Sequence, residues 1–332
     1  MKDLFKLNLR LFAGNTNVTT DVGLTDEMKT YYSDYMIDLV EPQLVHDQFG
    51  QKQDIPNNGG KTIEFRQYSP LAKALTPLVE GVTPDGQKLE MSVITAIVEQ
   101  YGGYVELSDV LLLTAIDKNL LVATKLLASQ AGRTLDTVTR EVLHGGTNVY
   151  FCGGKSARAQ LSYTDADNND AMKFDDIRRA VRALKVQNAP KINGTYVAIV
   201  HPDVSYDICS DPKWVNVKSY SDPDDMYDGE IGKIEGVRFV ETTEAKVYKG
   251  EGAGGRNVYG TLIIGDDAYG VTKVSGGGLQ HIVKQLGSAG TADPLNQRAT
   301  AGWKAIKVAE RLVEQYMIRI ESVSSFEETP EN

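Results

Sequence analysis

One short stretch of the sequence could bind a phosphate group, Gly153-Gly-Lys-Ser156. A phosphate-binding loop also needs a glycine five residues before Gly154, so that successive backbone amides can cradle the phosphates. Val149 occupies that position. The sequence therefore does not predict a nucleotide site here.

Two acidic runs have residue types that a divalent cation prefers. The first begins at Asp165, but Asp170 stands where a calcium loop needs its turn glycine, and Asp176 replaces the terminal glutamate. The second has no neutral oxygen ligands in place to close a site. Its carboxylates are Asp222, Asp224, Asp225, Asp228 and Glu230. We interpret both runs as solvent-facing charge.

The histidines and cysteines form no catalytic or metal-binding pattern. No HExxH spacing and no GxSxG nucleophile elbow occurs, and the two cysteines are too far apart for a CxxC pair. These residues are His46, His144, His201, His281, Cys152 and Cys209. No catalytic residue, cofactor or metal ion is predicted. His144 is assigned to a helix end, where its positive form would suit the helix dipole.

The composition is that of a soluble folded protein, with 41% hydrophobic and 24% charged residues in 332. The formal net charge of −10 argues against nucleic-acid binding as the main function, because phosphate affinity comes from clustered Lys and Arg. It does not exclude a protein that encloses nucleic acid without binding its sequence. No apolar run is long enough to span a bilayer, so no membrane is expected as a partner.

The longest predicted element is a helix within Ser108–Gly146. Its narrow apolar stripe is spaced by three and four residues, as one face of a helix requires. The stripe consists of Leu121, Thr124, Ala128, Ala131, Leu135, Val138 and Val142. Ser108 is the expected N-cap. The helix is expected to end at Gly145 and Gly146, because glycine adopts the left-handed backbone conformation of a helix C-terminus at little cost in free energy.

Two strands before this helix predict a long hairpin. The first lies in residues 61–69, and the second in residues 89–107 with a break at Gly102 and Gly103. The connection between them is rich in Pro and Gly and should be irregular. Such a hairpin has little core of its own and is marginal in water unless something covers it. We infer that another subunit supplies the cover.

Residues 150–285 are predicted to form one α+β lobe. A helix over 174–185 is followed by a strand near 195–200, a short helix after His201 and Pro202, and strands near 236–240, 260–264 and 270–274. The first helix has a basic face, interpreted as solvent-facing, with an acidic neighbour or DNA as alternatives. That face consists of Arg178, Arg179, Arg182 and Lys185. Two more strands, near 303–308 and 316–321, follow the lobe.

The residues now described resemble a known family. The opening LNLRLFAGN is similar to the start of many tailed-phage major capsid proteins. The run Asp293-Pro-Leu-Asn-Gln-Arg-Ala-Thr-Ala-Gly-Trp-Lys304, with Met317-Ile-Arg-Ile-Glu-Ser322, resembles the phage N4-like major capsid protein family. The signature residues are Asp293, Pro294, Asn296, Arg298, Gly302 and Trp303, with His201 and Pro202 earlier in the chain.

The resemblance implies an α+β, HK97-like capsid fold. Residues 1–55 would be an N-terminal arm and 56–105 an extended β-hairpin loop. Residues 106–150 with 290–332 would form a peripheral domain around the spine helix, and 151–289 an axial domain. Flexibility of the loop is expected at Gly59, Gly60, Gly102 and Gly103.

The implied function is that of a major capsid protein that assembles with itself into pentamers and hexamers of an icosahedral shell. That shell would enclose double-stranded DNA in the virion after assembly in the host cytoplasm. Separate scaffolding, portal and decoration proteins are the expected partners. The alternatives are an encapsulin-like compartment subunit with the same fold and, further away, a soluble α+β enzyme.

Overall fold

The computed structural model describes residues 44–54, 61–68, 71–78, 80–81, 83, 85–114, 119–164, 169–214, 233–273, 279–288 and 293–326. The N-terminal arm before residue 44, Gly59 and Gly60, residues 165–168 and the acidic run 222–230 lie outside these residues. The following description concerns the described residues alone.

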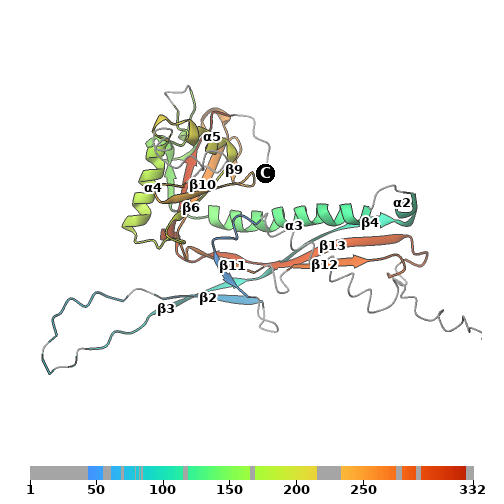
Figure 1. Cartoon of the computed structure of the whole chain (residues 1–332), viewed down its shortest axis with the longest axis horizontal. Helices are drawn as coiled ribbons and strands as arrows, with labels where there is room; N and C mark the ends of the chain where they lie inside the picture. The colour runs from blue at the N-terminus through green and yellow to red at the C-terminus, as the bar shows by residue number, and fades with distance from the viewer. Residues whose placement is uncertain are drawn as a thin grey trace, which may run out of the picture.

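The chain forms three parts that extend in different directions (Figure 1). The lobe is a compact α/β body. The strut is the long helix α3 (Asn119–His144) with the three-stranded sheet that runs beside it. The ribbon is the hairpin of β2 (Thr62–Tyr68) and β3 (Met91–Ile97), which projects away from both.

The lobe is built on a mixed sheet with the strand order β5-β15-β10-β6-β8-β7, and β9 pairs with β10. Its strands are β5 (Val149–Phe151), β6 (Tyr196–Val200), β7 (Lys233–Ile234), β8 (Val237–Glu241), β9 (Val247–Tyr248), β10 (Val258–Ile264) and β15 (Met317–Ser322). Every residue of β6 and β10 is buried, because both faces of the sheet are covered. Helices α4 (Phe174–Val186) and α5 (Pro202–Ser210) pack in the core on one face.

The other face of the lobe sheet meets the end of the strut. Leu143, near the end of α3, packs with Ile199 and Leu262 of the sheet. The same cluster includes Tyr269 and Val271 of β11 (Tyr269–Thr272). Residues of the lobe and of the strut therefore form one buried hydrophobic cluster, which holds the two parts together.

The strut buries a stripe of small residues on α3 against its sheet. Ala128, Ala131 and Leu135 pack with Ala301 and Trp303. The sheet has the order β12-β13-β4 and is antiparallel throughout; its strands are β12 (Leu279–Lys284), β13 (Arg298–Lys307) and β4 (Glu99–Ser108). Alanine at the contact lets helix and sheet approach closely, which explains the narrow stripe in the sequence.

The helix predicted over Ser108–Gly146 appears as two, α2 (Asp109–Thr114) and α3, with residues 115–118 outside the described part. The Ser108 hydroxyl accepts a hydrogen bond from the Leu111 amide at 3.2 Å, as expected for an N-cap. Helix α3 ends at His144, directly before Gly145 as predicted, but neither Gly145 nor Gly146 is left-handed. Arginine side chains complete this end instead: Arg311 donates to the Val142 carbonyl and Arg319 to the His144 carbonyl.

Strand membership differs from the prediction of one lobe over 150–285. Strand β11 leaves the lobe and pairs with β1 (Gln51–Gln53) and β14 (Ala309–Arg311), and β12 pairs with β13 in the strut. Conversely, β15 was predicted to belong to the peripheral domain, but it lies next to β10 inside the lobe sheet. The chain thus passes from lobe to strut and back before it ends.

Candidate assembly surfaces

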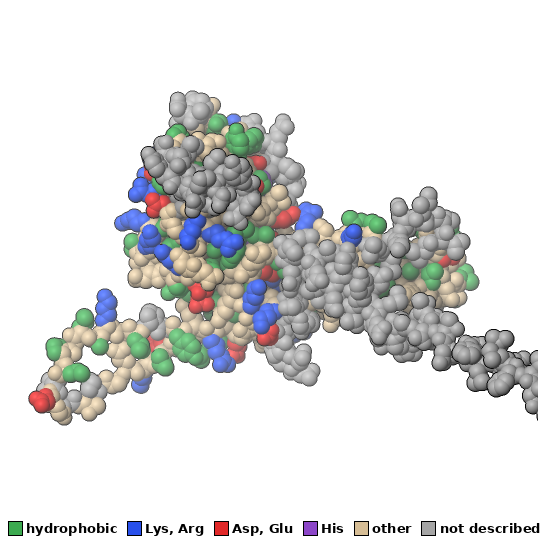
Figure 2. All heavy atoms as spheres, viewed as in Figure 1, with side chains coloured by type: hydrophobic (Ala, Val, Ile, Leu, Met, Phe, Trp, Pro, Cys, Tyr) green, Lys and Arg blue, Asp and Glu red, His purple; other side chains and the backbone are tan. Residues whose placement is uncertain are grey.

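The ribbon exposes apolar side chains along most of its length (Figure 2). In the connection between its strands, Leu75, Leu78 and Leu89 are 82%, 77% and 72% exposed. One face of the paired strands also exposes the apolar side chains of Tyr68, Met91, Val93 and Ile97, beside the charged Glu64 and Arg66. Exposed apolar surface of this extent marks a site of interaction.

The base of the ribbon is anchored in its own chain. Ile63, Phe65 and Ala96, on the opposite face of the strands, are buried and pack with Val308 and Leu312. Because that base is covered within the chain, the prediction that the whole hairpin lacks contacts in its own molecule is wrong for these residues. The projecting part beyond them has exposed apolar side chains, and its cover by another subunit stays a prediction.

The strand break predicted at Gly102 and Gly103 is also wrong. Strand β4 runs through both glycines and pairs with Trp303 and Lys304. A Cβ atom on Gly102 would lie 2.8 Å from the Trp303 carbonyl oxygen, so glycine permits a close approach of two backbones. The chain leaves the ribbon at Val98, between β3 and β4, where the Val98 amide donates to the Lys61 carbonyl at 2.9 Å.

The strut also exposes individual apolar side chains. Val110 and Leu126 are 64% and 66% exposed, and Leu295 is 75% exposed. Figure 1 shows α2 and the adjacent ends of β4 and β13 at the end of the strut far from the lobe. The chain therefore carries apolar surface on two separate parts.

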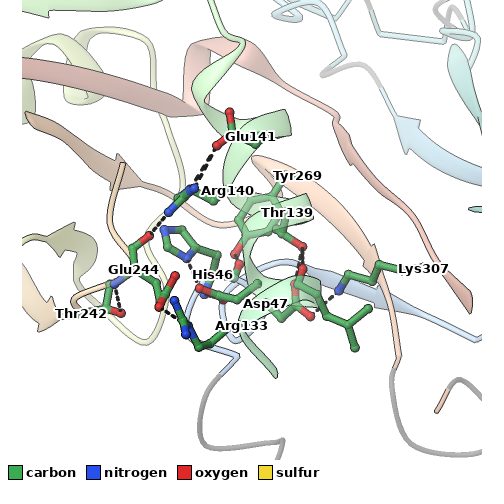
Figure 3. A network of polar contacts seen from close by, with 12 residues as sticks. His46, Asp47, Arg133, Thr139, Arg140, Glu141, Thr242, Glu244, Tyr269 and Lys307 are labelled. Atoms are coloured by element: carbon green, nitrogen blue, oxygen red, sulfur yellow. Dashed lines mark hydrogen bonds and ion pairs between the residues drawn. The ribbon is translucent and has the colours of Figure 1, made fainter. Parts of the chain in front are cut away.

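A buried polar network joins residues 44–50 to the strut (Figure 3). Asp136 of α3 accepts hydrogen bonds from the His46 backbone amide at 2.8 Å and pairs with the His46 ring at 2.7 Å. Asp47 accepts from the Thr139 hydroxyl at 2.6 Å and pairs with the ammonium group of Lys307. These charges are all buried, so each depends on its partner.

The same stretch of α3 is tied to the lobe. Arg140 donates to the Glu244 carbonyl at 2.7 Å, and Arg133 pairs with the Glu244 carboxylate at 2.7 Å. Figure 3 shows these contacts next to the His46 and Asp47 pairs. About two turns of the spine helix therefore position the last part of the predicted N-terminal arm, the strut sheet and the lobe.

His144 closes the strut against the lobe as a neutral side chain. Burial lowers its pKa well below the usual 6.5, and the nearby positive charges of Arg319 and Arg140 act in the same direction. The Tyr248 hydroxyl lies 3.2 Å from its Nδ1 atom. The prediction of a positive His144 at the helix end is wrong, because Arg311 and Arg319 supply that charge from other strands.

The signature residues of the C-terminal run lie together at the start of β13. The Asp293 carboxylate accepts from the Arg298 amide at 2.8 Å, and the Asn296 amide donates to the Asp293 carbonyl at 3.1 Å. Pro294 is exposed in this turn, and Asn296 is left-handed with φ of 53°. The turn therefore sets where β13 begins.

Two further signature residues hold β13 against its neighbours. Gly302 lies opposite Tyr104, whose Cβ atom would be 2.9 Å from a Cβ on the glycine. The Trp303 indole donates to the Gln130 side chain of α3 at 3.1 Å. These contacts are structural ones within the strut.

His201 and Pro202 lie in a different place, in the lobe. They begin α5, where the His201 Nδ1 atom accepts from the Asp203 amide at 3.2 Å and Pro202 occupies the first turn. Burial lowers the pKa of His201, which favours this acceptor form. The structure does not bring them to the residues of β13.

Within the described ranges, no group of three or more His, Cys, Asp or Glu side chains is placed to hold a metal ion. Lys155, of the phosphate-loop-like stretch, lies 3.8 Å from the Asp170 carboxylate. Among the described helices, none is both long and apolar enough to cross a membrane. Sequence reasoning missed the buried charges of α3 and β13, because Asp136, Arg140 and Lys307 resemble exposed residues in a polar pattern.

Comparison with known proteins gives two findings. The sequence profile of a family described as phage capsid protein matches residues 51–287. A search of curated proteins finds no match.

Several solved phage capsids have the same fold. The capsid of Ralstonia phage GP4 is similar at 15% identity and a TM-score of 0.63, over 86% of this chain and 87% of that chain. The cyanophage Pam1 capsid is similar at 16% identity and a TM-score of 0.63, over 87% and 93%. The head of Helicobacter pylori bacteriophage KHP40 is similar at 11% identity and a TM-score of 0.58, over 84% and 88%. The predicted HK97-like fold is thereby confirmed.

Proposed function

Because this chain belongs to the phage capsid protein family, we propose that its ribbon is the element by which adjacent copies hold one another in the shell. The chain is a major capsid protein, a structural protein whose copies form the shell of a phage head in the virion. The proposal concerns how that shell is held together.

The exposed apolar surface of the ribbon carries this proposal. Leu75, Leu78 and Leu89 lie beyond the part of the ribbon that its own chain covers. Their burial by a neighbour would stabilise the contact by roughly 25 cal/mol per Å² of apolar surface. The exposed residues Val110, Leu126 and Leu295 of the strut are the surface that we propose receives them.

Such a contact uses different surfaces on the two partners, so it can repeat around a ring of copies. We propose that the rings are pentamers and hexamers of an icosahedral shell. The lobe would be the axial domain, directed at the centre of each ring. The strut, with β1, β11 and β14, would form the peripheral domain.

The finer assignments follow the sequence resemblance. We propose membership in the N4-like subfamily on the runs 293–304 and 317–322. The shell would enclose double-stranded DNA without sequence-specific contacts. Assembly would take place in the host cytoplasm with separate scaffolding and portal proteins, and decoration proteins could be added afterwards.

The test is assembly of the purified chain, followed by sedimentation and electron microscopy. Leu75→Asp with Leu78→Asp is expected to prevent shell formation and to leave the urea unfolding of the protomer unchanged. Lys88→Ala on the same ribbon is the matched control and is expected to assemble normally. Shells formed by the double variant at the usual protein concentration would refute the role of the ribbon. Protein cargo instead of DNA in native particles would favour the compartment alternative.

A further inference from the structure

The outward face of α4 concentrates positive charge on a chain whose net charge is −10. Arg178, Arg179, Arg182 and Lys185 are all exposed, while Ile177 and Leu184 on the other face are buried in the lobe core. Figure 2 shows Lys and Arg side chains gathered on the side of the lobe where α4 lies. This face is covered by none of the described residues of its own chain.

These cations line a groove of about 650 Å³, which we call the basic groove. Its other lining residues are Asp175, Val181, Val186 and Glu235. Arg178 pairs with Glu235 at 3.5 Å, and Arg179 donates to the Tyr150 hydroxyl at 3.0 Å. Within the part of the chain that the structure describes, Arg182 and Lys185 have no carboxylate partner.

The lining favours an acidic peptide over a nucleic acid. Val186 is 65% exposed beside the two unpaired cations, so the groove offers apolar surface as well as charge. Arg178 and Arg179 already have partners in Glu235 and Tyr150, so the two remaining cations are fewer than a run of closely spaced DNA phosphates would need. A segment that alternates carboxylates with apolar side chains would fit both features.

The chain itself contains such a segment, residues 222–230, with the sequence DPDDMYDGE. Met226 and Tyr227 stand between its carboxylates, and it contains no Lys or Arg. The described residues that precede and follow it, Trp214 and Lys233, both belong to the lobe, because Trp214 packs on Phe239 and Lys233 begins β7. Every copy therefore carries one basic groove on its lobe and one acidic segment in the chain between two residues of that lobe, so unlike surfaces are available for a repeating contact.

We propose that the basic groove of one copy binds the acidic segment 222–230 of the adjacent copy. Carboxylates of the segment would pair with Arg182 and Lys185, and its apolar side chains would cover Val186. The inference rests on the assembly proposed above and adds a second contact to it, between lobes. Contacts of this kind are screened by salt and set orientation more than affinity.

The first test is charge reversal with rescue, measured as the protein concentration at which empty shells form. Arg182→Glu with Lys185→Glu, and separately Asp224→Lys with Asp225→Lys, should each raise that concentration about tenfold at low salt. The two pairs combined in one chain should restore assembly. The control is Lys125→Glu with Lys304→Glu, which makes the same charge change on exposed residues of the strut. Adding Asp224→Lys and Asp225→Lys to this control variant should not restore its assembly.

The second test identifies which copy supplies the segment. Two chains in a Cys209→Ser background, one with Arg182→Cys and one with Asp225→Cys, are mixed, assembled and oxidised. A disulfide-linked heterodimer that forms only in shells is the expected result. A disulfide that forms only when both cysteines are on one chain would overturn the proposal, since the segment would then bind its own groove.

Other outcomes separate this proposal from its rivals. Absence of rescue in the combined variant would refute the pairing. Normal empty shells that fail only to retain DNA would identify the groove as a nucleic-acid contact instead. Failure of the unchanged chain to form any shell when it is produced together with its scaffolding protein would refute the proposed assembly itself.

Discussion

Lys307 of β13 and Asp47 form an ion pair inside the strut, although 260 positions separate them in the chain. Their side chains are 1% and 7% exposed. The pair connects the last part of the predicted N-terminal arm, residues 1–55, to the strand that packs against the spine helix. It is therefore a point at which the arm is attached to the body of the protein.

Replacing Lys307 by methionine should destabilise the protomer by about 3–5 kcal/mol, because the Asp47 carboxylate would remain buried without its counter-ion. Urea unfolding monitored by circular dichroism measures this loss. Asp47→Asn with Lys307→Met removes both charges, so its cost should be smaller than the sum of the two single costs. Strict additivity would show that the two groups do not interact.

Gly102→Ala should destabilise the strut by about 1–3 kcal/mol, since the added Cβ would meet the Trp303 carbonyl of the paired strand. Gly86→Ala is the matched control, because no atom lies within 4 Å of a Cβ at that position. Its unfolding free energy should change by less than about 0.5 kcal/mol. An equal loss of unfolding free energy in the two variants would instead support the role as a flexible hinge that was expected for Gly102.

Stability should fall as the pH drops below about 6.5. Burial lowers the pKa of His144 in the folded protein, so the unfolded chain takes up a proton that the folded chain does not. The free energy of unfolding should therefore decrease by up to about 1.4 kcal/mol per pH unit from this group, and show no such dependence above pH 7. Burial lowers the pKa of His201 and His281 in the same direction.

The measurement for this pH dependence is urea unfolding at pH 7.5 and 5.5. His144→Gln is expected to be less stable at both values and to lose less stability between them than the unchanged protein. An identical pH slope in the variant would contradict a neutral, buried His144.

The two cysteines should differ in reactivity. Burial raises the pKa of the Cys152 thiol well above its usual 9.0, and Asp176 nearby raises it further, whereas Cys209 is only half-buried. A thiol reagent such as DTNB should therefore modify one cysteine in the folded protein at pH 8 and both in urea. Cys209→Ser should abolish the reaction of the folded protein, and a rapid reaction that persists would place Cys152 at the surface.

Local patterns in the sequence were enough to predict those helices and strands whose structure depends on residues close together in the chain. The alternation in residues 61–69 predicted β2, and the charge and apolar spacing of 174–185 predicted α4, with its buried and basic faces. His201 and Pro202 predicted the start of α5. The resemblance of residues 293–304 and 317–322 to capsid proteins led to the fold and the function.

The tertiary structure alone decided which strands share a sheet and which charges are buried. A strand such as β15 has the same alternation wherever it pairs, so its place beside β10 depends on which sheet edge is free after the chain folds. Asp136 and Lys307 have the side chains of surface residues, and they are buried because partners from other parts of the chain compensate their charge. Contacts between residues far apart in the sequence leave no periodic signal in it, and these contacts position the arm, the strut and the lobe.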